Sequence, residues 1–465
     1  MNKISGVKSQ ARYSYPTLGL VAASMFLFSA VWSQAYAQST ATDLYSFTGE
    51  PDAANPEAGF VPGFLQGADG NLYGTSFRGG ADNYGAVFQA TTAGAEKLIY
   101  SFTDTSDGAF PVALVQGTDG SFYGTTTQTS TTSVGTVFKL TASGTLTTLQ
   151  SFAATDAGIP SGLVIGKDGN LYGTTAGASG VNDGTIFEIA LPAGTYSTLY
   201  TFRLTDGAAT PTADPDGLAP NVLIQGADGN LYGTTTGSTS SNEGEVFKLT
   251  LPGAAFSVLY NFGSSTTVTD GTDPTGLIQG ADGNLYGTTV FGGANGLGTV
   301  YSLSLTGTAP TYIHQFPDPT ATSWDGTQPG LLVQGADGNI YVATQPLSIA
   351  DGGAAGATYG TILKVNTAGT SFSTLADFIP ALSTQNFESP QGLIQASNGS
   401  FYGTTFNGGT ASLGSVYTVA AAVSSTSAGG VGDSGGSGGG AFAPLVSLPL
   451  LLAGLLRRRI RKSKI

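Results

Sequence analysis

Short runs of alternating apolar and polar residues, bounded by glycine, proline and asparagine, recur along most of this chain. The stretch Thr275–Thr289 reads TGLIQGADGNLYGTT, and variants of it occur seven times with Asp-Gly or Asn-Gly at the centre. The spacings between successive centres are 50, 49, 60, 54, 55 and 61 residues, and self-similarity at such a period indicates a repeat architecture. The seven pairs are Asp69-Gly70, Asp119-Gly120, Asp168-Gly169, Asp228-Gly229, Asp282-Gly283, Asp337-Gly338 and Asn398-Gly399.

Each repeat predicts four short strands. The first run ends at the Asp-Gly pair (GLIQG), and the second follows it directly (NLYGTT). The third and fourth read like Gly135–Leu140 (GTVFKL) and Leu259–Phe262 (LYNF). Runs of this length and composition are typical of β-strands, and Asp-Gly between two of them favours a hairpin with a type I′ turn.

Seven units of four strands predict an all-β fold, a seven-bladed β-propeller of four-stranded blades, over residues 44–422. The N-terminal run Leu44–Phe47 is a fourth-type strand with no repeat before it, and the last repeat (Gly392–Val419) has no fourth strand. We expect these two to pair and close the ring. The alternative is an irregular β-solenoid, which would instead need polar capping repeats.

The two ends of the chain carry membrane-targeting patterns. Residues 1–37 predict a secretory signal peptide, with a basic start, an apolar run at Leu18–Trp32, and an A-x-A site that places cleavage between Ala37 and Gln38. An uncleaved N-terminal anchor is the alternative. Residues 423–440 form a Gly/Ser-rich linker, 441–456 an apolar run read as a transmembrane segment, and 457–465 a basic tail expected in the cytoplasm. The alternative for the apolar run is a buried helix of the domain.

The repeat, with its GLIQGxDGNLYGTT core followed by GTVFKLT and LYSF, resembles the GloVer repeat of bacterial choice-of-anchor tandem repeat proteins. The resemblance extends from about Leu44 to Val419. The sixth copy departs from it, reading NIYVATQ at Asn339–Gln345, and the seventh has Asn398 in place of Asp. The family implies a location more than an activity, and it brings no catalytic or ligand residues with it.

The tail resembles a GlyGly-CTERM sorting signal, in which a glycine-rich motif precedes an apolar helix and an arginine-rich end. The motif here comprises Gly435, Gly436, Gly438, Gly439 and Gly440. The resemblance implies a rhombosortase-like protease as a partner for tail processing. It also implies export to the cell surface or outer membrane of a Gram-negative bacterium, or release from it.

Charge and composition exclude some classes of binding partner and of site. Setting aside the basic ends, the body has 7 basic against 30 acidic residues, about −23, which argues against nucleic acid because phosphate binding needs cationic contacts. We expect this charge to serve solubility, and the alternative is a surface that binds cations or polycations. The chain has no cysteine, so disulfides, thiolate metal sites and a cysteine nucleophile are excluded.

The residues that could carry chemistry sit at repeated positions. The single histidine, His314, stands where tyrosine usually stands in the LYSF run, so we expect a structural role. The repeated turn aspartates could be interpreted as Ca²⁺ ligands. We interpret them as turn residues, because Asp followed by Gly is what the turn alone requires. A second acidic set before a proline, Asp107, Asp270 and Asp325, reads as loops. The tyrosines of LYGTT fit packing between blades, or alternatively a ring for carbohydrate: Tyr73, Tyr123, Tyr172, Tyr232, Tyr286, Tyr341 and Tyr402.

These patterns predict an exported cell-surface protein without catalytic residues, cofactor or metal, acting as a binding or structural module through propeller loops. Its ligand, glycan or protein, is not identified by the sequence. The alternative is a secreted propeller enzyme, a lyase or glycosidase acting on polysaccharide, which needs an acid/base cluster in the central channel. A structural surface-layer role is the third possibility.

Overall fold

The computed structural model is all-β, and its described residues contain no helix. Accordingly, the described part of the chain offers no helix long and apolar enough to cross a membrane. The described residues are 41–56, 63–128, 134–153, 158–177, 184–202, 218–236, 243–263, 270–307, 309–317, 325–345, 360–378 and 387–420.

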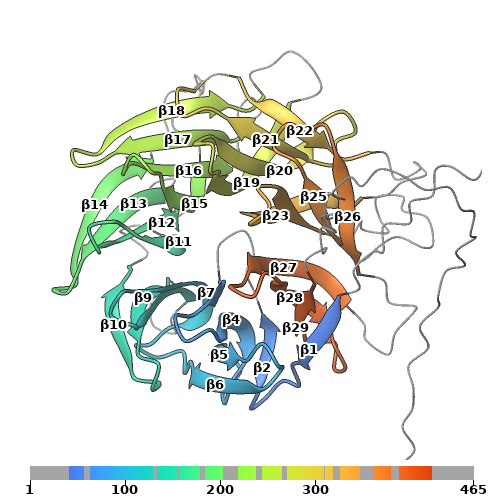
Figure 1. Cartoon of the computed structure of the whole chain (residues 1–465). Coiled ribbons are helices and arrows are strands. Elements are labelled where there is room, and N and C mark those ends of the chain that lie inside the picture. Colours follow the sequence, from blue (N-terminus) through green and yellow to red (C-terminus); the bar gives the residue numbers. More distant parts are fainter. Residues whose placement is uncertain are drawn as a thin grey trace, which may run out of the picture. The chain divides into compact units, whose positions relative to one another are not determined.

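The strands form seven antiparallel sheets, the blades of a β-propeller (Figure 1). Blade 1 contains β2 (Ala53–Pro56), β3 (Phe64–Gln66), β4 (Leu72–Gly79), β5 (Ala86–Ala90) and β6 (Glu96–Ser101). Blade 2 contains β7 (Ala109–Gln116), β8 (Phe122–Gln128), β9 (Thr136–Leu140) and β10 (Leu146–Ser151). Blade 3 contains β11 (Ile159–Ile165), β12 (Leu171–Ala176), β13 (Gly184–Ala190) and β14 (Thr195–Phe202).

The remaining blades repeat this order. Blade 4 contains β15 (Leu218–Gln225), β16 (Leu231–Thr236), β17 (Glu245–Thr250) and β18 (Ala255–Asn261). Blade 5 contains β19 (Gly271–Gln279), β20 (Leu285–Gly292), β21 (Thr299–Leu303) and β22 (Thr311–Gln315). Blade 6 contains β23 (Thr327–Gln334), β24 (Ile340–Gln345), β25 (Thr361–Val365) and β26 (Phe372–Asp377). Blade 7 contains β27 (Phe387–Gln395), β28 (Phe401–Gly408), β29 (Ser415–Val419) and β1 (Thr42–Ser46).

The predicted hairpins are confirmed, but their predicted type I′ turns are not. A type I′ turn needs positive φ at both central residues, and in each of the seven described turns only the glycine of the Asp-Gly or Asn-Gly pair has it. In blade 5, Gln279 pairs with Leu285 across the turn, and Gly283 has φ +88°, a conformation that glycine adopts without steric cost. The first strand is longer than its sequence run predicts. It begins at Gly271 and includes Pro274, with an irregularity between Pro274 and Leu277 that accommodates the missing N–H.

The N-terminal strand β1 pairs with β29, so the sheet of blade 7 combines segments from both ends of the described chain. Thr42 lies opposite Thr418 and Ser46 opposite Ser415, with an irregularity between Asp43 and Tyr45. Figure 1 shows the blue strand β1 beside β29.

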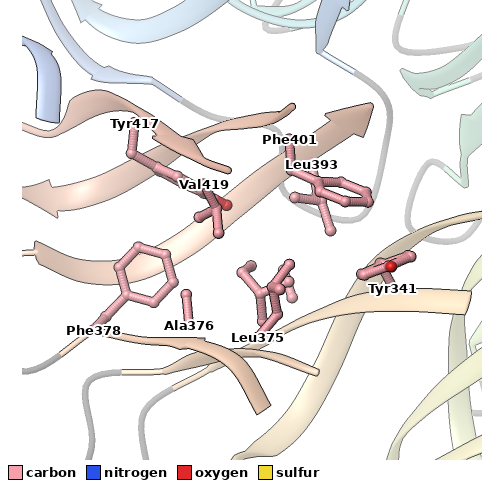
Figure 2. Packing of buried hydrophobic residues seen from close by; sticks show 10 residues of the cluster. Tyr341, Leu375, Ala376, Phe378, Leu393, Phe401, Tyr417 and Val419 are labelled. Atoms are coloured by element: carbon pink, nitrogen blue, oxygen red, sulfur yellow. The ribbon is translucent and has the colours of Figure 1, made fainter. Parts of the chain in front are cut away.

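The core lies between adjacent blades, because each sheet is covered on both faces by its neighbours. Figure 2 shows the cluster between blades 6 and 7, in which Tyr341 and Leu375 face Phe401 and Leu393. Within a blade, the glycine of LYGTT leaves room for the aromatic ring of the third strand. A Cβ at Gly124 would lie 2.4 Å from Cζ of Phe138.

The sixth copy departs from the repeat at both the LYGTT glycine and the aromatic residue of the third strand, and the two changes compensate each other in volume. Val342 replaces the glycine, and its cross-strand partner is Leu363 where most blades have Phe or Tyr. A larger residue on one strand is thus matched by a smaller one on the other, which keeps the packed volume similar.

A strained residue precedes the first-strand proline in six blades. These residues have φ between 44° and 57°, a region that non-glycine residues rarely adopt. In four of them the N–H group donates to a carbonyl of the preceding blade, as in the bond from Asn55 to Leu413 (2.6 Å). Ile159 in blade 3 is the exception. The six are Asn55, Phe110, Ala219, Asp273, Gln328 and Ser389.

Candidate functional site on the turn face

The seven Asp-Gly and Asn-Gly turns project from the same end of their blades, and we call this end the turn face. Asp282 shows how its residues are used. Its Oδ1 accepts the N–H of Asn284 (3.1 Å), and its Oδ2 accepts the Asn284 amide (2.9 Å) and the Tyr286 hydroxyl (2.7 Å). Burial opposes the shift, but the bonds from Tyr286 and Asn284 lower the pKa of Asp282. The interpretation of these aspartates as turn residues is therefore confirmed.

The repeated tyrosines pack between blades, as one of the two sequence interpretations predicted. All seven residues are between 0 and 4% exposed, so their ring faces are closed to a sugar. Burial and the bond to Asp282 raise the pKa of Tyr286 to about 12. The seventh blade retains this contact, but the direction of the hydrogen bond is reversed: the Asn398 amide donates to the Tyr402 hydroxyl (2.8 Å).

Three blades add a lysine to this arrangement. The Nζ of Lys139 lies 2.8 Å from Asp119, and its ammonium lowers the pKa of that carboxyl to about 2. Lys248 and Lys364 contact Asp228 and Asp337 in the same way. These pairs are partly exposed, so each contributes little to stability. In the described residues, no group of three or more His, Asp or Glu side chains is placed to hold a metal ion.

A chain of glutamines links the blades across the turn face, and we call it the glutamine relay. The glutamine of GLIQG in one blade accepts the N–H at the start of the preceding blade's turn. It also donates to the glycine carbonyl of its own turn. At the interface of blades 3 and 4, Gln225 accepts from Lys167 (2.7 Å) and donates to Gly229 (2.9 Å). The six glutamines are Gln66, Gln116, Gln225, Gln279, Gln334 and Gln395.

The relay has one gap, at the interface between blades 2 and 3, which we call the 2/3 seam. Ile165 stands where the other blades have glutamine. As a result, within the described residues, no side-chain amide bridges the N–H of Thr118 and the carbonyl of Gly169. The sequence contained this signal, a polar residue recurring in an otherwise apolar strand with a single exception, but its role was not predicted.

Two equivalent grooves flank blade 3 on this face. The 3/4 groove, about 380 Å³, is lined by residues that include Gln225, Glu188 and Pro252. The 2/3 groove, about 260 Å³, is lined by Thr118, Gly169 and Ile165, together with an apolar wall of Leu149, Leu191 and Pro192. The second groove therefore lies at the gap of the relay. A polar depression of about 620 Å³ lies elsewhere, around Tyr100 and Asp107.

The second acidic set lies in loops, as predicted, but its side chains are buried. Asp107 accepts the hydroxyl of Tyr100 (3.0 Å), and Asp270 accepts that of Tyr260 (3.1 Å). His314 replaces the tyrosine of this pair, with its Nε2 2.8 Å from Asp325 and both side chains about 5% exposed or less. The structural role expected for His314 is thus supported by its place in a repeated contact between the fourth strand and the following loop.

The equivalent contact between blades 7 and 1, the 7/1 seam, includes an additional carboxyl group. Tyr45 donates to Asp52 (2.8 Å), and Glu96 lies against the same pair. Burial, and then the charge of Asp52, raise the pKa of Glu96 to about 7. In blade 2, the residue at the position of Glu96 is Leu146, which carries no charge.

The targeting residues predicted from the sequence lie outside the described residues. These are Ala37 and Gln38 at the signal cleavage site, the glycines between 435 and 440, and the apolar run 441–456. Their assignment stays a prediction.

The chain matches the Gloeobacter/Verrucomicrobia repeat family over residues 26–219 and 219–428, and it belongs to this family. No curated protein matches the chain. Among solved structures, it is similar to a streptogramin B lyase (17% identity, 83% of this chain and 99% of that chain, TM-score 0.54). It is also similar to virginiamycin B lyase from Staphylococcus aureus (14% identity, 81% and 97%, TM-score 0.52). At these identities the similarity shows the propeller fold alone.

Proposed function

We propose that this repeat propeller is a binding module without catalytic activity. One observation carries the proposal: the repeated polar side chains are used in structural hydrogen bonds, while at the 2/3 groove no side-chain amide of the described residues bridges the two backbone groups that lie beside an apolar wall. Ligand sites are commonly concave and mostly apolar with a few polar groups that orient the ligand. A glycan or a protein segment reaching the turn face is the partner class.

A screen of the protein against a glycan array and against peptide libraries tests this function. The expected result is saturable binding that is lost when the 2/3 groove is filled by a larger side chain at Pro192 or Leu191. Self-association without any saturable ligand would instead support a structural surface-layer role.

A second candidate, an enzyme acting on polysaccharide, is favoured by one observation in the 3/4 groove. The Tyr172 hydroxyl lies 2.7 Å from Asp168 and 3.3 Å from Glu188, so two carboxylates meet at one phenol. Glycosidases use such a carboxylate pair. If the pair is catalytic, Asp168→Asn and Glu188→Gln each abolish cleavage of a polysaccharide panel. Wild-type protein that cleaves no member of the panel contradicts the enzyme.

Export and surface anchoring complete the proposal. The signal pattern at 1–37, the glycine motif and the apolar run 441–456 support them, together with a protease of the rhombosortase type for tail processing. A chain ending at Ser434 is expected to be released into the medium. Retention of that chain on cells would show that the tail is not the anchor.

The pairing of β1 with β29 supports a further part of the proposal, that the N-terminal strand locks the ring. Phe47, the residue directly after β1, is fully buried between blades 7 and 1. Removal of residues 41–47 is expected to lower the unfolding temperature and to expose the edge of β29 to proteolysis.

A further inference from the structure

The six complete positions of the glutamine relay show which chemical group the turn face accommodates at each seam. In every case a primary carboxamide fits between an N–H of one turn and a C=O of the next. The oxygen accepts over 2.6–2.8 Å, as from Ala227 to Gln279 and from Ala281 to Gln334. The nitrogen donates over 2.9–3.3 Å, as from Gln279 to Gly283.

At the 2/3 seam the same two backbone groups are present without the amide. Thr118 corresponds to Lys167 and Gly169 to Gly229, and both line the 2/3 groove. Both residues are exposed, so a molecule from solvent can reach them. Ile165 supplies the aliphatic part of the missing side chain but neither its acceptor nor its donor.

We propose that the 2/3 groove binds a primary carboxamide of a ligand, such as the side chain of asparagine or glutamine in a peptide. The ligand oxygen accepts from the N–H of Thr118, and the ligand NH₂ donates to the carbonyl of Gly169. The aliphatic part of the ligand packs against Leu149, Leu191 and Pro192. This inference rests on the proposed binding function and names the ligand class for its site.

Three other polar groups do not match this pair. A carboxylate has no hydrogen to donate to Gly169, and a guanidinium has no acceptor for Thr118. A trans secondary amide, as in an acetamido sugar, directs its N–H away from the side of its oxygen. The groove also contains the carboxylates of Asp119 and Asp168 against the one ammonium of Lys139, which favours a neutral ligand over an anionic one.

The test uses the full chain labelled with ¹⁵N-threonine and titrated with propionamide, with the Thr118 amide resonance as the readout. Saturable shifts are expected with propionamide. Propionate, N,N-dimethylpropionamide, which has no N–H to donate, and N-acetylglucosamine are expected to bind at least tenfold more weakly. Equal shifts with the dimethyl amide or with propionate would overturn the proposal that the ligand group is a primary carboxamide. Stronger shifts with N-acetylglucosamine would show instead that the site prefers acetamido sugars.

Two matched substitutions locate the site. Ile165→Gln restores the residue found at six seams and is expected to reduce propionamide affinity at least tenfold. Gln225→Ile, followed with ¹⁵N-lysine, is expected to create a second site at Lys167 in the 3/4 groove. If Ile165→Gln leaves the affinity unchanged, the inference is wrong. If a glycan or peptide from the screen still binds that variant, the binding function stands without this site; if nothing binds the wild type, both fail.

Discussion

The 7/1 seam keeps more of its repeated links than the 2/3 seam, although it joins segments that are much farther apart in the chain. The 7/1 seam joins segments more than 300 residues apart, and it keeps its repeated links. Ser397 donates to Gln66 (2.8 Å) and Asn55 donates to Leu413 across this distance, and Tyr45 donates to Asp52 within the N-terminal segment that connects the two blades. The 2/3 seam joins consecutive repeats, and Ile165, Gln150 and an unstrained Ile159 stand at the corresponding positions.

The difference shows what each seam has to do. Consecutive blades are connected by a short stretch of backbone, so their contact costs little chain entropy and survives the loss of several hydrogen bonds. The 2/3 seam does retain its apolar cluster and the bond from Thr125 to the carbonyl of Ser161 (3.2 Å). Blade 1 is joined by a short stretch of backbone only to β1, and the other three strands of blade 7 come from the far end of the described chain. These strands are held at the 7/1 seam by the pairing of β1 with β29 and by their contacts with blade 1, so the links there matter more than those at the 2/3 seam.

The largest expected effect comes from Phe47→Ala. Both Phe47 and its counterpart Phe152 are buried, so each substitution to alanine is expected to cost about 3–5 kcal/mol in denaturant unfolding. Only Phe47→Ala should also release its own strand, because β1 pairs with a distant segment whereas β10 forms a hairpin with β9. Amide exchange of residues 42–46 measures this release. Equal protection of β1 and β10 in the two variants would contradict the contrast.

The second effect is a pH dependence specific to the 7/1 seam. The pKa of Glu96 is raised from 4.5 to about 7 in the folded protein. Its stabilising contribution is therefore complete below pH 4.5 and is lost as the pH rises through 7, by about 2–3 kcal/mol. Denaturation of wild type and Glu96→Gln at pH 4.5 and 8 measures this loss, which the variant should not show. An identical pH profile for the two proteins would remove Glu96 as the cause.

The third effect compares the relay at the two seams. Gln66→Ile removes two hydrogen bonds at the 7/1 seam and is expected to destabilise the protein by about 1–2 kcal/mol. Ile165→Gln adds the corresponding bonds at the 2/3 seam and should stabilise it by about 1 kcal/mol. Chemical denaturation of both variants gives the signs directly. A destabilising Ile165→Gln would mean that the groove cannot accept the relay geometry.

The smallest effect concerns the residue before the first-strand proline. Ala219 has φ 46°, so Ala219→Gly should relieve strain and stabilise the protein by about 0.5–1 kcal/mol. Ile159 at the 2/3 seam lacks this conformation, so Ile159→Gly should destabilise the protein by a similar amount. Thermal unfolding distinguishes the two cases. A shift of the same sign in both variants would show that backbone strain does not separate these seams.

Much of the fold could be predicted from sequence because its signals are local. Asp-Gly between two alternating runs specifies a hairpin, and seven copies specify the number of blades. The extension of β19 back to Gly271 could not be predicted, because a proline-containing run resembles a loop until the neighbouring blade supplies hydrogen-bond partners. The exchange of Gly and Phe for Val342 and Leu363 likewise becomes evident only from the pairing of the two strands.

The candidate site was less accessible to sequence reasoning. The sequence weighed Tyr286 and Asp282 as ligand residues against structural roles, and their mutual bond settles the structural one. It passed over Gln279 and its counterparts, because a glutamine in a strand has no assigned partner until the next blade is in place.

By itself, the sequence determined the repeat, the four strands of each blade, the position of each hairpin and the number of blades, since each depends on residues close together in the chain. Only the tertiary structure decided which polar groups form hydrogen bonds within the protein and which remain at the surface. Each bond of the relay between blades joins residues 48 to 59 positions apart, and across the 7/1 seam 331 positions apart. The role of Ile165 therefore cannot be inferred from its own strand. It follows from the turn of the preceding blade, for which Ile165 provides no side-chain amide.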